Sequence, residues 1–290
     1  MYEIVKKRVL NDAGTTIELV VKAPLVARKC LAGQFIIFRL DEYGERVPLT
    51  IADYDREKGT VTIMFQPVGQ STMMLASLNE GDCILDFVGP LGKPTHTEGL
   101  KRVAVVGGGV GCAIAYPVAK AMHERGVQVD MIAGFRSKDI VMLEDEMRAA
   151  STNLYITTDD GSYGEKGFTT DKLKALIESG CNYDEVIAIG PGMMMKFVCK
   201  ATEPYGVKTI VSLNPIMIDG TGMCGGCRVT VGGETKFACV DGPEFDGHLI
   251  DFDQAMQRQA MYRTEEGRAK LAFLEGETHH GGCGHCGGDE

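Results

Sequence analysis

The first third of the chain alternates short hydrophobic and polar runs in the manner of β-strands. Three such runs lie at Thr16–Val21, Gln34–Leu40 and Thr60–Phe65, and turn-forming residues such as Asp12-Ala13-Gly14 separate them. Strands of this length at this spacing are typical of a small barrel or sandwich. The pattern therefore predicts an all-β domain over residues 1–98.

One stretch of this domain has helical rather than strand spacing. Between residues 66 and 80 the apolar positions are Met73, Met74, Leu75 and Leu78. Gly69, Ser71 and Thr72 lie at the start of this predicted helix, where free backbone N–H groups and the helix dipole favour an anion. An ordinary N-cap is the simpler interpretation of the two hydroxyl residues, and an anion site is the functional one.

From Lys101 the pattern changes to alternating strands and helices. The apolar run Val103–Val106 leads directly into Gly107-Gly108-Gly109-Val110-Gly111, and a helix follows to about Arg125. A glycine-rich dinucleotide turn requires this order, because glycines let the backbone approach a pyrophosphate at the helix N-terminus. Further elements are predicted at Gln128–Ala133, Leu154–Thr157, Thr169–Glu178, Glu185–Ile189, Met193–Glu203 and Thr209–Leu213. We expect the strand at Thr209–Leu213 to complete a parallel sheet.

Three loops lie at the carboxyl ends of these strands, where parallel sheets bind ligands. They are Gly134-Phe135-Arg136, Thr158-Asp159-Asp160-Gly161-Ser162 and Gly190-Pro191-Gly192-Met193. No acidic residue immediately follows the second strand, so the usual ribose carboxylate of a Rossmann site is missing. The pocket is therefore expected to be built in another way.

The spacing of cysteines after the sheet gives the most specific chemical signal. Two residues separate Cys224 from Cys227, Cys239 follows later, and Asp219 precedes Cys224 with four residues between them. Plant-type ferredoxins hold a [2Fe–2S] cluster with the spacing C-x4-C-x2-C…C. A zinc ribbon would normally add a second close pair of ligands, whereas Cys239 stands alone. We predict a [2Fe–2S] site, with Asp219 either its fourth ligand or a turn carboxylate.

Composition limits the partners and the compartment. With 290 residues the chain has room for two or three domains, and its net charge of −10 argues against nucleic acid and anionic membranes. The uncharged stretch from Val103 to Ala119 contains several glycines and Pro117, which argues against a membrane span. Isolated cysteines in apolar surroundings predict buried free thiols in a reducing, cytoplasmic compartment; they are Cys30, Cys83, Cys112, Cys181 and Cys199.

Taken together, these blocks resemble the ferredoxin-reductase superfamily, in its branch with a C-terminal [2Fe–2S] domain. The resemblance covers about residues 1–250 and implies three domains. They are a β-barrel FAD domain at 1–98, an α/β NAD-binding domain at 99–213 and a small [2Fe–2S] domain at 214–250. A helical segment and a Cys/His tail follow at 251–290.

The resemblance also implies which residues hold the cofactors. Arg46-Val47-Pro48-Leu49-Thr50 is similar to the family's flavin motif, although Val47 here separates the arginine from the proline. The residues expected at FAD are Arg46, Pro48, Leu49, Thr50, Phe65, Gln66, Gly69, Ser71 and Thr72. Those expected at the nicotinamide nucleotide are Gly107, Gly108, Gly109, Gly111, Arg136, Asp160, Gly161, Gly190, Pro191, Gly192 and Met193. Gly190 stands where many reductases carry a cysteine, so no thiol is expected beside the nicotinamide.

The aspartate at the first cluster position favours one part of this branch. Electron-transfer subunits of dihydroorotate dehydrogenase B carry four cysteines, whereas the small subunit of NADH-dependent reduced ferredoxin:NADP oxidoreductases is similar to this chain in having Asp. The resemblance implies electron transfer between NAD(H), FAD and the cluster. It also implies a larger partner with its own flavin and [4Fe–4S] clusters that binds NADP(H) and ferredoxin. The alternatives are a dihydroorotate dehydrogenase B subunit and a cluster-bearing docking module without NAD chemistry.

The C-terminal region carries two further predictions. Residues 251–275 read as one or two helices that dock either on the chain's own core or in a groove of the partner. Beyond them, a tract with His279, Cys283 and Cys286 is either an extra metal site or a tail without function.

Overall fold

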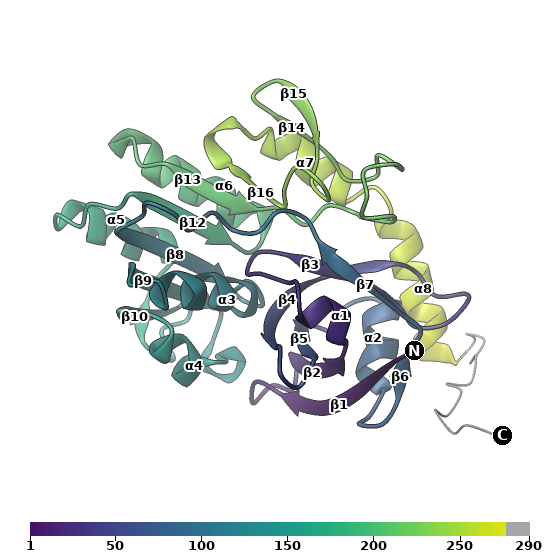
Figure 1. Cartoon of the computed structure of the whole chain (residues 1–290). Helices are drawn as coiled ribbons and strands as arrows, with labels where there is room; N and C mark the ends of the chain where they lie inside the picture. The colour runs from purple at the N-terminus through teal and green to yellow at the C-terminus, as the bar shows by residue number, and fades with distance from the viewer. Residues whose placement is uncertain (277–290) are drawn as a thin grey trace.

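The structure is a computed structural model that describes residues 1–276, so the predicted metal site at Cys283 and Cys286 lies outside the described residues. The described chain forms two seven-stranded sheets and a two-stranded hairpin. The N-terminal sheet and the central sheet lie side by side (Figure 1). The hairpin lies at the top of this view near β16, and the last helix, α8, runs down its right-hand side. The predicted fold class is confirmed: a barrel-like antiparallel domain, an α/β domain and a small C-terminal domain.

The N-terminal sheet is antiparallel throughout, with strand order β6-β1-β2-β5-β4-β3-β7. It curls into a barrel because alternate side chains, such as Leu19, Ile36 and Ile63, turn inward and are fully buried. The strands are β1 (Tyr2–Val9), β2 (Ile17–Lys22), β3 (Phe35–Arg39), β4 (Val47–Asp55), β5 (Thr60–Phe65), β6 (Cys83–Ile84) and β7 (Asp86–Leu91).

Two helices accompany the barrel. Helix α2 (Gln70–Ser77) follows the predicted spacing and buries Leu75. Helix α1 (Pro24–Ala27) lies in the connection between β2 and β3. Proline at the first helical position favours one short helical turn there, because its fixed φ suits a helix start.

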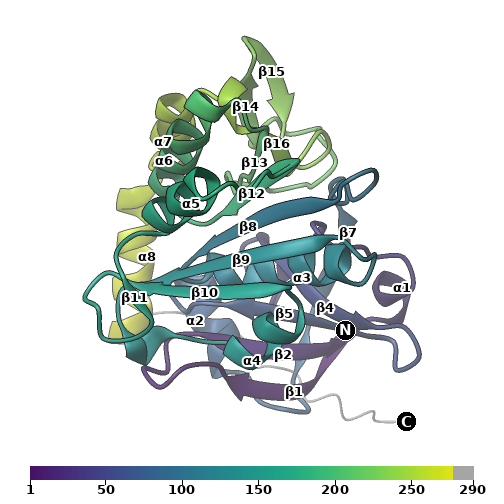
Figure 2. The same ribbon diagram turned by 90° about the vertical axis from the view of Figure 1, so that its left-hand side faces the viewer.

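The central sheet has strand order β11-β10-β9-β8-β12-β13-β16 and is parallel from β11 to β13. Its strands are β8 (Arg102–Gly108), β9 (Gln128–Phe135), β10 (Asn153–Thr158), β11 (Glu165–Lys166), β12 (Glu185–Ile189), β13 (Thr209–Ser212) and β16 (Glu244–Asp246). Its helices are α3 (Gly111–His123), α4 (Glu144–Ala149), α5 (Thr169–Glu178) and α6 (Gly192–Thr202), and short 3-10 turns occur at Lys138–Ile140, Glu203–Tyr205 and Gly247–Leu249. The two helix layers cover opposite faces of the sheet (Figure 2).

Strand β16 corrects the expected end of this sheet. The strand at Thr209–Leu213 does not complete the sheet, because β16 pairs antiparallel with β13 through Val211 and Phe245. Since β16 follows the cysteine-containing segment in sequence, the sheet draws its last strand from beyond that segment. The C-terminal domain is therefore anchored by backbone hydrogen bonds to the α/β domain.

Helix α3 joins the barrel to the central sheet. Ala52 of β4 and Met64 of β5 lie in the same buried cluster as Val118 and Met122 of α3. At the edge of this contact, Lys120 forms an ion pair with Asp53 at 3.0 Å. The two domains consequently share a packed interface rather than a bare linker.

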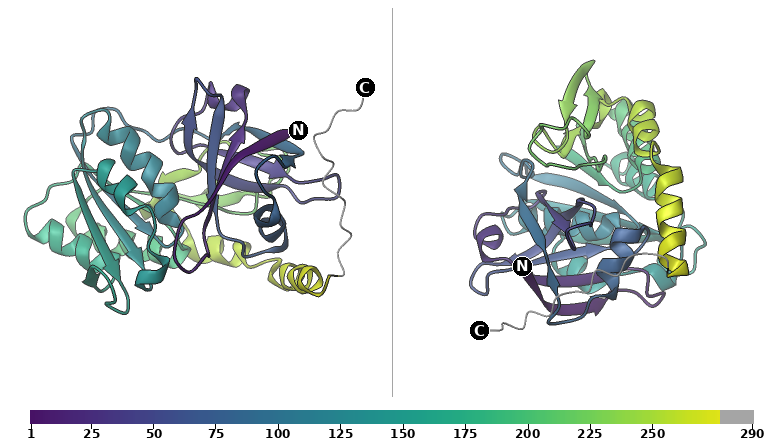
Figure 3. Two further views of the ribbon diagram at one scale, coloured as in Figure 1. Left: turned by 90° about the horizontal axis from the view of Figure 1, so that it is seen from below. Right: turned by 90° about the vertical axis from the view of Figure 1, so that its right-hand side faces the viewer.

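The hairpin and the last helices pack on the rest of the chain. The hairpin consists of β14 (Arg228–Val231) and β15 (Glu234–Phe237), and Cys227 and Cys239 beside it belong to the core of the α/β domain. Helix α7 (Phe252–Gln259) contacts α6 and β14, and Phe252 is buried. Helix α8 (Arg263–Glu275) lies along α2 without burying a residue (Figure 3). The predicted helices are confirmed, and α7 docks on the chain's own core.

The isolated cysteines follow the prediction of buried free thiols in three of five positions. Cys30, Cys112 and Cys199 are buried free thiols, and Cys181 is free and half-buried. For Cys83 the prediction of a free thiol is wrong, because its sulfur is disulfide-bonded. Cys83 lies half-buried on the short edge strand β6, where a sulfur is accessible to another thiol. Among the residues described, no helix is both long and apolar enough to cross a membrane.

Candidate functional site

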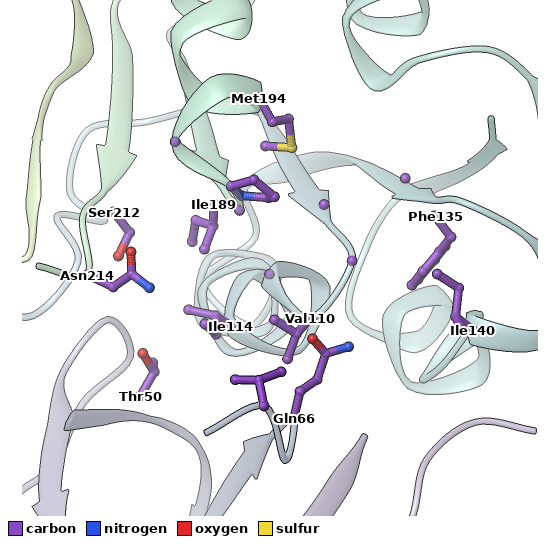
Figure 4. A pocket seen from close by; sticks show the side chains of 18 of the residues that line it. Thr50, Gln66, Val110, Ile114, Phe135, Ile140, Ile189, Met194, Ser212 and Asn214 are labelled. Carbon is purple, nitrogen blue, oxygen red and sulfur yellow. The ribbon is translucent and has the colours of Figure 1, made fainter. Parts of the chain in front are cut away.

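A cavity of about 1060 Å³ lies between the barrel and the carboxyl end of the parallel sheet. Figure 4 shows Thr50 and Gln66 entering it from the barrel side, opposite Ile189 and Met194 of the sheet side. Its walls come from segments far apart in sequence, which the packing of α3 on the barrel helps to bring together. The cavity is large enough for an extended organic cofactor with a second ligand beside it.

The structure brings part of the predicted flavin set to this cavity. Pro48, Leu49, Thr50 and Gln66 line it. Phe65 does not, because its side chain is buried in the barrel core. Since β5 alternates in and out, neighbours Phe65 and Gln66 point to opposite sides.

The residues at the start of α2 do not line the cavity, and their hydroxyl groups are engaged locally. Thr72 Oγ1 accepts the backbone N–H groups of Val68 and Gly69, both at 3.1 Å. Ser71 Oγ donates to a carboxylate oxygen of Glu45 at 2.5 Å. In this structure Thr72 therefore acts as a capping residue, which is the simpler of the two interpretations of the sequence.

The glycine turns line the cavity from the sheet side. Of the residues predicted for the nucleotide, the lining set is Gly108, Gly109, Gly111, Arg136, Gly190, Pro191 and Gly192. Four predicted residues do not line it: Gly107, Asp160, Gly161 and Met193. Their neighbours Asp159 and Met194 do, while Met193 is half exposed at 48%. Asp160 instead accepts the N–H of Ser162 at 2.9 Å and closes its own turn.

Two glycines of the first turn are required by its geometry. Gly109 has a φ of +57°, which side chains disfavour, and its N–H donates to the Gly134 carbonyl at 2.8 Å. A Cβ on Gly111 would overlap the carbonyl oxygen of Ile189. The first turn of α3 therefore lies directly against the end of β12, and Gly109, Val110 and Gly111 form this part of the cavity wall. The N–H groups of Cys112 and Ala113 already donate to the carbonyls of Gly109 and Val110, both at 3.0 Å.

Several lining residues were not predicted. Ser212 and Asn214, at the end of β13, face the cavity in Figure 4. Their position just after a parallel strand was the signal that could have found them. Gln259 reaches the cavity from the end of α7 and donates to Asn214 at 3.3 Å, and no local pattern indicated this.

The cluster segment folds as a loop between β13 and the hairpin. Gly220, Gly222 and Gly225 have positive φ, which allows the sharp bends of this loop. Cys227 and Cys239 are both buried and their sulfurs lie 3.2 Å apart, whereas Cys224 is exposed. The loop thus brings one predicted ligand pair together.

Asp219 and Cys224 form the other side of the loop. The Cys224 N–H donates to Asp219 Oδ2 at 2.7 Å, and the Thr221 N–H donates to Oδ1 at 2.9 Å. The N–H of Thr221, and next that of Cys224, lowers the pKa of the Asp219 carboxyl by stabilising its charge. Asp219 is therefore ionised and fixed beside the backbone of Cys224.

This arrangement fits a two-iron cluster better than a single metal ion. Within residues 1–276 no group of three or more His, Cys, Asp or Glu side chains converges as one ion would require. A [2Fe–2S] cluster divides its four ligands between two irons, so two pairs suffice. Burial, followed by the hydrogen bond from Cys227, raises the pKa of Cys239 to about 12, so a thiolate there requires nearby positive charge such as iron. The donor set therefore fits the cluster.

Arg46 of the predicted flavin motif contacts this loop instead of the cavity. Its Nε donates to the Ile218 carbonyl at 2.5 Å, immediately before Asp219. The barrel and the cluster loop are therefore joined directly by a side chain.

Comparison with known proteins agrees with this architecture. Residues 214–251 match the iron–sulfur cluster binding domain of dihydroorotate dehydrogenase B. Along 94% of its length the chain is 45% identical to a Thermotoga maritima homologue of the electron transfer subunit of dihydroorotate dehydrogenase B (NAD(+)), covering 95% of that protein. It is also 57% identical over its whole length to an uncharacterized Clostridium beijerinckii protein, all of which it covers.

Solved structures give the same result. A chain of an NADH-dependent reduced ferredoxin–NADP oxidoreductase, described for flavin-based electron bifurcation, is 45% identical and superimposes with a TM-score of 0.88. The match covers 94% of this chain and 98% of that one. The Amycolatopsis cytochrome P450 reductase GcoB, 20% identical with a TM-score of 0.59 over 71% of this chain and 65% of its own, shares the fold. The chain therefore belongs to the family of iron–sulfur electron-transfer subunits of the dihydroorotate dehydrogenase B type, within the ferredoxin-reductase-like oxidoreductases.

Proposed function

We propose that this chain exchanges hydride between NAD(H) and FAD in the shared cavity and passes single electrons through a [2Fe–2S] cluster. The partner is a larger subunit with its own flavin and [4Fe–4S] clusters, as in an electron-bifurcating NADH-dependent ferredoxin:NADP oxidoreductase. The observation that carries this proposal is that flavin-motif residues and glycine turns line one cavity. The cluster loop is attached to the same barrel through Arg46.

The chain's residues have separate tasks in this proposal. Bound FAD would supply the conversion between two-electron hydride transfer and one-electron transfer. Thr50 and Gln66 offer polar groups to the flavin from the barrel, and the glycine turn before α3 lets the nucleotide phosphates approach the positive end of the helix dipole. Hydride transfer needs no protein acid or base, so these residues bind and orient, and the apolar wall of Leu49 and Ile114 limits water.

Asp219, Cys224, Cys227 and Cys239 would hold the cluster in two pairs, Asp219 with Cys224 and Cys227 with Cys239. The exposed side of the loop supports electron exchange with a partner, since Cys224 is exposed and Met223 is 88% exposed. The free thiols of Cys30, Cys112, Cys181 and Cys199 support a reducing, cytoplasmic compartment, whereas the disulfide-bonded Cys83 argues against it. Co-purification from the native source tests the partner; recovery of this chain from that source without any other subunit would contradict it.

Cofactor analysis tests the proposal as a whole. Protein purified without oxygen is expected to contain FAD and a [2Fe–2S] cluster in equal amounts. One zinc ion per chain with no iron or sulfide would contradict the cluster, and absence of flavin would contradict the cavity assignment.

We further propose NAD(H) rather than NADP(H) as the nucleotide of this chain. Arg136 at the cavity is the kind of residue that could hold a 2′-phosphate, whereas Asp159 beside it would repel one. The resemblance to NADH-dependent relatives decides for NAD(H). Flavin reduction in the isolated chain should be much faster with NADH than with NADPH, and comparable rates would contradict the preference.

A second candidate is the electron transfer subunit of dihydroorotate dehydrogenase B, which the domain match at residues 214–251 favours. The aspartate in the first cluster position argues against it. A native complex that oxidises dihydroorotate would establish this candidate in place of the first.

A further inference from the structure

Three arginines from separate parts of the chain each donate a hydrogen bond to a backbone carbonyl of the cluster loop. Arg46, at the start of β4, bonds Ile218 at 2.5 Å, and Arg228, at the start of β14, bonds Gly225 at 2.7 Å. Arg258, in α7, bonds Gly226 at 3.1 Å. One loop of nine residues, 218–226, therefore collects three guanidinium groups.

These contacts determine the direction of the peptide groups. The loop has only trans peptide bonds, in which the C=O and the following N–H point in opposite directions. A carbonyl held outward by an arginine consequently turns the N–H of the next residue inward. At Gly226 this result is visible, since its N–H points at Cys224 Sγ at 3.4 Å.

Arg258 differs from the other arginine at the C-G-G-C turn. Arg228 is exposed, whereas Arg258 is half-buried and its Nε is buried without a hydrogen-bond partner among the described residues. Its helix is anchored by an ion pair of Asp253 with Lys196 at 2.6 Å and by a hydrogen bond of Thr230 to Gln254 at 2.7 Å. A cation withdrawn from water and held in place acts more strongly on a nearby charge than an exposed one.

We propose that Arg46, Arg228 and Arg258 form an arginine clamp that turns the loop amides toward the cluster, and that Arg258 raises the cluster's reduction potential more than the exposed Arg228 does. This inference rests on the proposed function, because it requires the [2Fe–2S] cluster. Each electron added to the cluster increases its negative charge, so inward N–H groups and a fixed cation stabilise the reduced form. Arg258 is a positioning residue here and not a cluster ligand.

The experiment is an anaerobic redox titration of the full-length holoprotein, with the reduced cluster followed by EPR and iron content measured alongside. R258Q is expected to lower the midpoint potential, and R258K, which keeps the charge, to lie nearer the wild type. R228Q should lower the potential less than R258Q because Arg228 is exposed. The matched control is R263Q, which removes the same charge from an exposed position five residues further along the chain.

The possible outcomes separate the inferences. A full cluster with an unchanged midpoint in R258Q overturns the role of Arg258. If R258Q purifies without its cluster, R258K and R228Q decide: a lower midpoint in either supports the clamp, and a wild-type midpoint in both overturns it. Wild-type protein that lacks iron and sulfide would contradict the proposed function, and the clamp with it. Wild-type protein with a cluster whose midpoint potential does not respond to the substitutions would contradict the clamp alone.

Discussion

Asp219 has two roles available on one carboxylate. Each of its oxygens accepts one backbone N–H in the cluster loop, from Thr221 and from Cys224. A carboxylate oxygen has a further lone pair, so these bonds and an iron ligand are compatible. As an oxygen donor, aspartate is a harder ligand than a thiolate and tunes iron differently.

Three substitutions of Asp219 distinguish a role in stabilising the loop turn from a role as an iron ligand. Asp219→Cys is expected to assemble a [2Fe–2S] cluster with a changed EPR spectrum and midpoint potential, because spacing and ligand charge are preserved. Asp219→Asn keeps an oxygen that can accept an N–H but loses the anionic ligand, so it should hold less cluster, as should Asp219→Ala. Iron content and EPR of the three variants are the measurement. A full cluster with a wild-type spectrum in Asp219→Asn would show that the residue only forms the turn.

Helix α3 depends on a glycine at its first position. A Cβ on Gly111 would meet backbone atoms of Ile189 and Gly190, which cannot move aside as a flexible side chain can. The close approach of Gly111 to the backbone of Ile189 and Gly190 consequently fixes where α3 begins relative to the end of β12. It also fixes this part of the cavity wall. Local structure, packing and the predicted phosphate contact all depend on this position.

Gly111→Ala should therefore destabilise the protein by roughly 1–3 kcal/mol, the usual cost of overpacking, and weaken NADH binding. The matched control is Gly267→Ala in the exposed helix α8, where the added Cβ meets nothing within 4 Å. That change should stabilise the protein by about 0.5–1 kcal/mol, because alanine favours a helix. Urea unfolding gives both values, and equal effects of the two substitutions would refute the packing argument.

At the level of elements, the success of sequence reasoning followed the strength of the local pattern. Strands β5 and β12 and helix α5 were predicted with the bounds that the structure has, since each carries its own hydrophobic period. Strand β16 has three residues and no period, so only its pairing with β13 defines it.

The candidate site shows the same limit. The glycine turns and the cysteine spacing were recognisable because backbone geometry requires those residue types in fixed order. Gln259 at the cavity and Arg258 at the cluster loop could not be predicted, because their placement depends on how α7 docks.

The whole molecule is joined at several polar contacts between its domains, and one of them includes a carboxyl group whose pKa is strongly raised. Glu244 of β16 accepts a hydrogen bond from Thr95 Oγ1, in the connection between barrel and sheet, at 2.6 Å. Burial, and next the nearby Glu185, raises the pKa of Glu244 from the ordinary 4.5 to about 7. The carboxyl therefore remains protonated in the folded protein at a pH where the unfolded chain has released the proton.

Stability is expected to depend on pH through Glu244. The protonated Glu244 carboxyl makes its full contribution to the free energy of unfolding below about pH 4.5, and this contribution is lost as the pH rises through about 7. Glu244→Gln, which is always neutral, should remove this dependence and gain up to roughly 3 kcal/mol over the wild type between pH 5 and pH 8. Urea unfolding across this range, with the exposed Glu234→Gln as control, is the measurement. A parallel loss of stability in both Glu244→Gln and the wild type would contradict the assignment.

The central claim is that one chain carries electrons from NADH through its cavity to its cluster. The most direct measurement mixes the purified full-length chain with NADH anaerobically, follows flavin absorbance, and records EPR spectra of samples frozen at intervals. The predicted result is loss of oxidised-flavin absorbance first, followed by the signal of a reduced [2Fe–2S] cluster. A chain whose cluster is intact but whose absorbance and EPR spectra do not respond to NADH would contradict the account and identify the chain as a docking module that receives electrons from its partner.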